Sequence, residues 1–391
     1  MAQLFINIRL VVVSLFLLIT TSMVQAQIPV HSWVDSIANY GYQAYMPAEK
    51  FKWGWNEAVM LRAVIRLYRE AAPAERRPYM DYIKGCMDKT LERANGRSPN
   101  DVTPGAGLVF LYSQLGEQAY LDKAKLIWSQ YLLIPRVRNY GVSHRATAIE
   151  LWDDTVYMIS GFLLEMYRLT GDDLYLDTLI EQYYAHKEHL QDQVTGLWVH
   201  GWVGERETRL DQCSQPGWAD PITRRSAEIW GRGTAWVVMT LADILEVIPQ
   251  EDVRWKQIAA ELKSMTAKLP ELQDTATGLW YQLPARIGDS DNFLESSCSA
   301  MFAYAITVGI KHKILDARTF RPVIEKAYTG LRRYAVESRP GAYLSPAKVC
   351  VGTCIGDKAY YLARQQTTDS DFAIGVYVFF GLEYEKMYGI R

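Results

Sequence analysis

Helical patterns fill most of this chain, and strand patterns are sparse. In the segment 55–71, Ala58, Leu61, Ile65 and Tyr68 recur at helical spacing, which predicts an amphipathic helix. The same pattern predicts ten further long helices and a shorter one. These cover residues 77–94, 103–115, 119–132, 155–169, 174–190, 229–247, 251–269, 297–310, 317–337 and 371–387, and 32–40 for the short helix. The sequence therefore predicts an all-α fold.

Short turns separate neighbouring helices, which favours antiparallel helical hairpins. Six hairpins closed into a ring would use all twelve predicted helices. Repeated turns support this interpretation: residues 195–198 (Thr-Gly-Leu-Trp) recur at 277–280, and residues 115–122 resemble 170–177. No low-complexity linker interrupts the pattern. Residues 27–391 are therefore predicted to form a single domain.

The first 26 residues have the pattern of an export signal. Arg9 precedes the apolar run 10–19, and Val24-Gln25-Ala26 supplies small residues suited to cleavage. The run is short for a membrane span. The alternative is an uncleaved anchor or a buried helix. We expect cleavage after Ala26, a periplasmic or secreted product, and no membrane association after cleavage.

Composition and charge narrow the classes of partner. The 391 residues carry a formal net charge of -2 without a basic tract, which argues against nucleic acid. The 12 Trp and 25 Tyr suit stacking on sugars, although aromatic residues also fill cores. Neither a Gly-x-Ser-x-Gly elbow nor a dinucleotide-binding glycine motif is present. We therefore expect no cofactor.

Cysteine and histidine spacing gives no sign of a metal site. Five cysteines leave at least one thiol unpaired. Cys350 could pair with Cys354, but Gly352 and Thr353 between them suggest a tight loop instead. His186 and His189 lack the spacing of a zinc protease motif, and we expect them on a solvated helix face. The sequence therefore predicts no bound metal.

One end of a helical ring would form a funnel, and its loops would carry the site. The long connections are 95–103, 133–154, 191–228, 280–296 and 339–370. Asp101 precedes one helix, and Asp153 and Asp154 precede another beside Trp152. Helix capping is the alternative role for these carboxylates. Adjacent carboxylates before an apolar helix nevertheless suggest a raised pKa at Asp154.

Aromatic and cationic residues gather in other connections. Trp230, Arg232 and Trp236 stand among small residues, which suits a flat anionic ligand, although a buried helix start with a structural arginine clamp is the alternative. His200 lies between two tryptophans and could equally make a structural hydrogen bond. His144 and Arg145 could hold a substrate anion or face solvent.

Four motifs together resemble glycoside hydrolase family 105, the unsaturated rhamnogalacturonyl hydrolases, which is related to the family 88 unsaturated glucuronyl hydrolases. They are Trp152 to Met158, Thr195 to Trp202, Trp230 to Trp236, and Glu295 to Ala305. The resemblance runs from about residue 50 to the end. It implies an (α/α)6 barrel, in agreement with the helix count.

The resemblance also implies a reaction. The substrate is an oligosaccharide whose non-reducing end carries a 4,5-unsaturated uronic acid left by a polysaccharide lyase. An acid protonates C4, water adds at C5, and the hemiketal opens to release the next sugar. This chemistry needs a carboxylic acid that keeps its proton near neutral pH.

The motifs assign roles to individual residues. Asp154 is implied as the general acid and base, and Asp101 as the second aspartate that positions water or a hydroxyl. His200, Trp230, Arg232 and Trp236 are implied to bind the sugar. From placement and charge we expect His144 or Arg145 to meet the uronate carboxylate, and Trp53 or Trp55 to add stacking.

Two departures from the family pattern stand out. Thr234 and Ala235 replace the usual Asn-Gly after Arg232-Gly233, which suggests a different pocket shape and substrate. Asp153 precedes the motif aspartate, so either carboxylate could face the pocket, although position favours Asp154. A sugar-binding barrel without catalysis, or another (α/α)6 glycosidase or lyase, are the competing functions. The parent polysaccharide and the oligomeric state cannot be read from the sequence.

Overall fold

The computed structural model describes residues 30, 32–145, 148–204 and 213–390. The predicted export signal, residues 1–26, lies outside the described residues. Eleven of the described helices have eleven or more residues, and a shorter helix, α1 (Trp33–Asn39), precedes them. Within this part of the chain, no helix combines the length and apolar character needed to cross a lipid bilayer.

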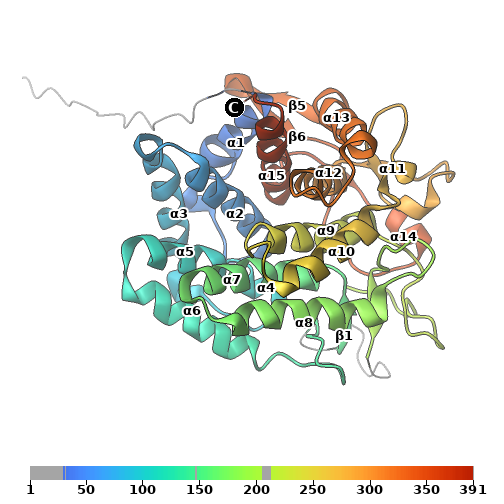
Figure 1. Cartoon of the computed structure of the whole chain (residues 1–391), viewed down its shortest axis with the longest axis horizontal. Helices are drawn as coiled ribbons and strands as arrows, with labels where there is room; N and C mark the ends of the chain where they lie inside the picture. The colour runs from blue at the N-terminus through green and yellow to red at the C-terminus, as the bar shows by residue number, and fades with distance from the viewer. Residues whose placement is uncertain (1–29, 31, 146–147, 205–212, 391) are drawn as a thin grey trace, which may run out of the picture.

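Six helices form an inner ring around the middle of the molecule (Figure 1). They are α2 (Trp55–Glu70), α5 (Gly105–Leu115), α7 (Thr155–Thr170), α9 (Gly231–Leu245), α12 (Ser296–Lys311) and α15 (Asp371–Met387). Each packs on the next, and α15 packs on α2, so the ring closes. This arrangement confirms the predicted all-α fold and its (α/α)6 barrel.

The outer layer consists of the helices that follow five of the inner ones. They are α3 (Arg77–Thr90), α6 (Gln118–Tyr131), α8 (Asp173–Leu190), α10 (Val253–Thr266) and α13 (Ala317–Tyr334). The sixth hairpin joins the two ends of the fold, because α1 packs against α15. Five hairpins are therefore local in sequence, and one is not.

Burial explains why one set of helices lies inside. Every residue of α9 is buried, as expected for a helix enclosed on all sides. By contrast, the outer helix α13 buries one stripe, which includes Phe320, Ile324, Ala327 and Leu331. For these two helices, the difference between an apolar and an amphipathic sequence thus corresponds to the difference in layer.

The repeated turns are structurally equivalent. Gly116 and Gly171 end α5 and α7 at φ +69° and +65°, left-handed conformations that glycine adopts without a steric penalty. The two Thr-Gly-Leu-Trp motifs also match. The Thr195 hydroxyl donates to the Asp192 carboxylate at 2.7 Å, and the Thr277 hydroxyl donates to Asp274 at 2.6 Å. The internal echoes in the sequence thus report the repeat of the barrel.

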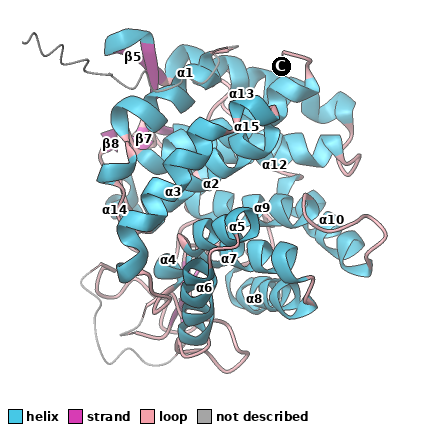
Figure 2. Ribbon diagram, turned by 90° about the vertical axis from the view of Figure 1, so that its left-hand side faces the viewer, coloured by secondary structure: helices cyan, strands magenta, loops and turns pink. Residues whose placement is uncertain are grey.

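Short strands lie in the long connections at the end of the barrel where the inner helices begin. Some of them, with the short helix α14 (Lys358–Leu362), can be followed along one edge in Figure 2. The described strands form four antiparallel pairs. They are β1 (Glu150–Trp152) with β2 (Gly201–Val203), β3 (Trp280–Tyr281) with β4 (Leu294–Glu295), β5 (Val336–Arg339) with β6 (Tyr343–Pro346), and β7 (Val349–Cys350) with β8 (Gln366–Thr367).

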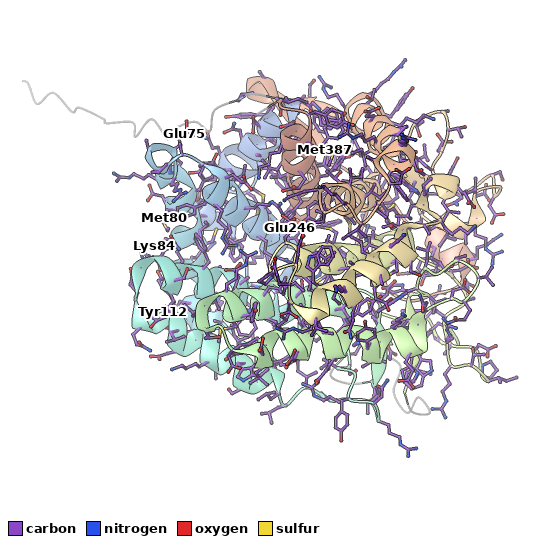
Figure 3. All side chains as sticks on the ribbon, in the orientation of Figure 1. Glu75, Met80, Lys84, Tyr112, Glu246 and Met387 are labelled. Carbon is purple, nitrogen blue, oxygen red and sulfur yellow. A yellow bond between two sulfur atoms is a disulfide. The ribbon has the colours of Figure 1, made fainter. Side chains whose placement is uncertain are left out.

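At the opposite end, charged side chains surround a cavity of about 200 Å³ among the carboxyl ends of inner helices. Glu246, which lines it, is labelled near the middle of the ring in Figure 3. Arg62 donates to Asp243 at 2.6 Å, and the Tyr304 hydroxyl donates to the same carboxylate at 2.8 Å. The side chains of Arg62 and Asp243 are only 10% and 8% exposed. This buried pair ties α2, α9 and α12 together.

We predict that Asp243→Ala lowers the free energy of unfolding by about 3–5 kcal/mol, because it leaves the Arg62 charge buried without its partner. Thermal and denaturant unfolding would measure the loss. Glu271→Ala is the control, because its partner Lys268 and Glu271 itself are 49% and 68% exposed. That variant should change stability by less than about 1 kcal/mol. Equal losses in the two variants would contradict the assignment.

Candidate active site

The long connections meet where the inner helices begin, as the sequence analysis expects. The pairing of β1 with β2 joins the connection before α7 to the one before α9. The amide of Asp153 extends this link by donating to the carbonyl of His200 at 2.9 Å. The motif that carries the paired aspartates and the motif that carries His200 are therefore held side by side.

Asp154 lies at the start of α7, in the N-cap position, but its side chain makes no capping hydrogen bond. Helix capping therefore does not explain this carboxylate. Its side chain is 13% exposed, and Oδ1 lies 3.3 Å from Nδ1 of His144. The same His144 nitrogen lies 3.0 Å from the hydroxyl of Thr155. Asp154 thus keeps a solvent-accessible edge beside a titratable ring.

The surroundings of Asp154 keep its carboxyl group protonated up to near neutral pH. Burial raises the pKa of Asp154 to about 7, against the opposing effects of Arg232, its own backbone amide and Arg145. Half-buried Arg145 lies over the ring of Trp152, 5.5 Å from its centre. A carboxyl group that titrates near neutrality is suited to giving and taking a proton under physiological conditions.

Asp153 points into the protein and is fully buried. Neither carboxylate oxygen has a hydrogen-bond partner among the described residues. A Cβ atom at Gly233 would lie 2.2 Å from Oδ2 of Asp153, so only glycine leaves room for this carboxyl group. Burial, and then the charge of Asp154, raise the pKa of Asp153 well above its ordinary value. Asp153 is therefore held neutral in the interior.

Asp101 lies in the short helix α4 (Pro99–Val102), which packs against α7. Its carboxylate accepts a 2.7 Å hydrogen bond from the hydroxyl of Ser98, the residue that caps α4. Ser98, and not Asp101, therefore caps α4, and Asp101 lies in the first turn of the helix. The preceding residue, Asn100, connects this segment to the paired aspartates. Its Nδ2 lies 3.5 Å from Nε2 of His144, the residue beside Asp154.

A series of ring contacts starts at His144, the first of them stacked, the second edge-on and the third tilted. Its ring lies 4.5 Å from that of Trp152, which lies 5.1 Å from His200, which lies 4.3 Å from Trp230. His200 is fully buried, with Nδ1 2.8 Å from the Tyr361 hydroxyl and Nε2 without a partner among the described residues. Burial lowers the pKa of His200 well below its ordinary value. His200 is therefore a neutral imidazole.

Arg232 is fully buried at the start of α9. It donates to the carbonyls of Cys350 at 2.8 Å and Val351 at 2.9 Å, and it lies 3.6 Å from Glu295. Its guanidinium also lies over the rings of Trp230 and Phe372, at 4.7 and 5.0 Å. This geometry corresponds to the structural clamp that the sequence analysis left open, and it leaves the guanidinium no exposed surface.

The four predicted tryptophans differ in access. Trp230 is 2% exposed, and Trp236, which stacks on Tyr157 at 4.3 Å, is 1% exposed. Trp53 and Trp55 are half-buried and therefore keep surface for a ligand. Trp53 donates from its indole nitrogen to the carbonyl of Asp101 at 2.9 Å. The stacking surface open to a ligand thus belongs to the connection before α2 and to the first residue of α2.

The departure at Thr234 acts on the loop that carries His200. The buried Thr234 hydroxyl accepts a hydrogen bond from the amide of Trp198 at 3.1 Å. Trp198 lies two residues before His200 in the sequence. Thr234 therefore holds this loop through a buried hydrogen bond and does not contribute to the surface of the pocket.

Sequence reasoning missed several contributors. Tyr361, which contacts His200, gives no local signal. Glu295 accepts hydrogen bonds from the amides of Cys298 and Cys350, and its place at the head of the Glu-Ser-Ser motif could have indicated a helix cap. Asn100, beside Asp101, could have been singled out from the same Ser-Pro-Asn-Asp segment.

The structure settles the cysteine pairing and corrects the prediction for the histidine pair. Cys354 is bonded to Cys213, not to Cys350, whose thiol is free and buried. This disulfide joins the connection before α9 to the one before α15. His186 is fully buried and hydrogen-bonded to the carbonyl of Gln182, so the predicted solvated face is wrong there. In the described ranges, no three His, Cys, Asp or Glu side chains are arranged to hold a metal ion.

The chain is similar in sequence to known hydrolases. The chain is 28% identical over 288 residues to the unsaturated rhamnogalacturonyl hydrolase YesR of Bacillus subtilis, covering 71% of this chain and 75% of that protein. It is 24% identical over 185 residues to an unsaturated 3S-rhamnoglycuronyl hydrolase of Alteromonas sp., covering 46% of this chain and 40% of that protein.

A family 105 glycoside hydrolase from C. acetobutylicum has the same fold, with a TM-score of 0.79 at 23% identity over 90% of this chain and 99% of the other. The family model of glycosyl hydrolase family 88 matches residues 30–388. Because this match spans nearly all of the described chain, the protein belongs to the glycosyl hydrolase family 88 group, which agrees with its resemblance to family 105, and it is a glycoside hydrolase.

Proposed function

We propose that the protein releases the 4,5-unsaturated uronic acid from the non-reducing end of oligosaccharides made by polysaccharide lyases. The carboxyl group of Asp154 gives its proton to C4 of the vinyl ether. Water adds at C5 and returns a proton to the Asp154 carboxylate. The hemiketal at C5 then opens, which frees the next sugar. One water is consumed, and the acid is regenerated.

One observation carries this proposal: a buried carboxyl group with a pKa of about 7 keeps an exposed edge at the mouth of the barrel. A vinyl ether needs an acid that is still protonated near neutral pH, and an ordinary aspartate is ionised there. Asp153 has a raised pKa too, but it has no exposed surface. Asp154 is therefore the proposed donor.

The neighbours of Asp154 suit a uronate. The titratable ring of His144 lies against Asp154, and the charge of Arg145 lowers the pKa of Asp154. Both side chains are therefore close to the place proposed for the unsaturated uronate. A carboxylate on the sugar would find there the positive charge that Arg145 supplies. Asp101 is the proposed partner for water or a hydroxyl, and Trp53 and Trp55 the proposed stacking surface.

The relatives support the class of substrate. The names of YesR and of the Alteromonas enzyme both specify an unsaturated uronide, one a rhamnogalacturonyl and the other a 3S-rhamnoglycuronyl compound. We extend only the shared feature, the unsaturated uronate, to this chain. Lyase digests of pectin, ulvan, glycosaminoglycan and arabinogalactan would identify the parent polysaccharide.

The proposed place of action is the periplasm or the exterior of the cell. The predicted export signal over residues 1–26 supports it. So does the disulfide between Cys213 and Cys354, since such bonds persist mainly in oxidising compartments.

We predict that Asp154→Asn lowers kcat on an unsaturated disaccharide by about 10²–10⁴-fold, because the amide cannot donate the proton. The loss of ultraviolet absorbance of the C4=C5 bond measures the rate. Asp153→Asn is the matched control and should keep most of the activity, because an amide closely mimics a carboxyl group that is already neutral. The opposite pattern would identify Asp153 as the acid.

The pH dependence of kcat/KM tests the protonation state. The active form of Asp154 is the protonated one, so the rate should fall as the pH rises through about 7, approaching tenfold per unit above it. The uronate of the substrate is already ionised throughout this range and adds no change. A rate that increases through pH 7 would rule out a protonated carboxyl group as the active form.

The raised pKa of Asp153 also predicts how the free energy of unfolding depends on pH. Its raised pKa means that the folded protein favours the protonated form, so stability is lost as the pH rises above about 4, where the carboxyl group of the unfolded chain ionises. Asp153→Asn should weaken this loss and leave the variant more stable than the parent at pH 7. Unfolding curves at several pH values would show it, and identical pH profiles would contradict it.

A further inference from the structure

A second cavity, of about 750 Å³, lies at the same end of the barrel as Asp154. We call it the distal cavity. It lies between the connection before α2, the end of α3 and the start of α15. Its volume is within the range of about 300–1,000 Å³ that is typical of ligand sites. The proposed reaction at Asp154 does not use it.

Basic side chains line the distal cavity. Lys50, Lys52, Lys89 and Arg93 all contribute to it, and all four are exposed. In the part of the chain that the structure describes, none of the four forms an ion pair. Their charges are therefore available to a ligand.

The acids of the distal cavity do not cancel this charge. Glu49, Glu57 and Asp371 also line it, so four cations face three carboxyl groups. Burial, and then the charge of Glu57, raise the pKa of Asp371 to about 7, and burial raises the pKa of Glu57 as well. The lining is therefore net positive at neutral pH, while its carboxyl groups can hydrogen-bond sugar hydroxyls.

Two pairs of neighbouring residues relate the distal cavity to the candidate active site. Phe51 and Lys52 line the cavity, and the adjacent Trp53 donates a hydrogen bond to the carbonyl of Asp101. On the other side, Asp371 lines the cavity, and the adjacent Phe372 packs 5.2 Å from Trp55. The half-buried Trp53 thus joins the cavity lining to Asp101, and the half-buried Trp55 contacts the neighbour of Asp371.

We infer that the distal cavity is a subsite for an acidic sugar, a uronate or a sulfated residue, beyond the linkage that is cleaved. The inference rests on the proposed function. An oligosaccharide bound at Asp154 would continue over Trp53 and Trp55, and its next anionic group would meet the basic lining. The preferred substrates then carry at least one acidic group besides the unsaturated uronate.

The test uses the double variant Lys89→Ala/Arg93→Ala. Both residues lie at the end of α3 or directly after it, outside the connection that carries Trp53. The control is Lys256→Ala/Lys263→Ala, which removes the same charge from exposed positions of the outer helix α10. Rates are measured on an unsaturated disaccharide and on unsaturated tetrasaccharides with either an acidic or a neutral extension.

The wild-type protein should prefer the acidic tetrasaccharide, and the preference should shrink as salt is added. The double variant should raise KM for that substrate about three- to thirtyfold, with kcat unchanged. The disaccharide, the neutral tetrasaccharide and the control variant should show no change. Equal KM values for the acidic tetrasaccharide in wild type and double variant, or no preference in the wild type, would overturn the subsite.

A binding measurement separates this inference from the proposed function. Calorimetry with a saturated acidic tetrasaccharide reports on the distal cavity even if no unsaturated substrate is cleaved. Weaker binding by the double variant than by the control supports the subsite. Equal binding by both variants, or complete competition by inorganic sulfate alone, overturns it and leaves at most a site for free anions.

Discussion

The geometry of the active-site end depends on one buried cation, Arg232. It lies in the first turn of α9, donates to the carbonyls of the last residue of β7 and of the residue after it, and lies 3.6 Å from Glu295 at the start of α12. Glu295 in turn accepts a hydrogen bond from the amide of Cys350. Three segments that are far apart in sequence are thus joined around a single charge. A buried guanidinium without these acceptors would be strongly destabilising, so the segments are fixed together or not at all.

The same charge acts on both carboxyl groups of the Asp153–Asp154 pair. It lowers the pKa of both Asp153 and Asp154, while burial raises both by more. What distinguishes the two is access. Asp153 fills the space that Gly233 leaves, whereas Asp154 lies beside His144 with an open edge. Two adjacent residues of the same type therefore have different chemistry because they point in different directions from one turn.

Local features of the fold could be predicted from the sequence, because their causes lie within a few residues. Gly116 and Gly171 end helices through their own backbone freedom, and Asp192 binds a threonine three residues away. The helices and the repeat follow from such patterns. The expectation that the long connections carry the candidate site agrees with where their motifs meet.

Features that depend on distant partners could not be predicted in the same way. The carbonyl acceptors of Arg232 lie 118 and 119 residues further along the chain, and Cys213 lies 141 residues from Cys354. His186 appeared solvated because its helix is polar around it, yet it is fully buried. Exposure at such positions is decided by which segment packs above them, and no local pattern contains that information.

The sixth hairpin has a consequence for how the barrel is assembled. Since α1 packs on α15, the first and the last helices of the fold must meet before the toroid has a complete wall. A polypeptide that lacks α15 has a gap between α12 and α2, and the apolar faces of these two helices stay exposed to water. Because α15 also carries Phe372 against Arg232, the ligand-binding mouth takes shape only when synthesis has reached the last segment. The packing of α15 therefore closes the ring of helices and completes the candidate active-site end in the same step.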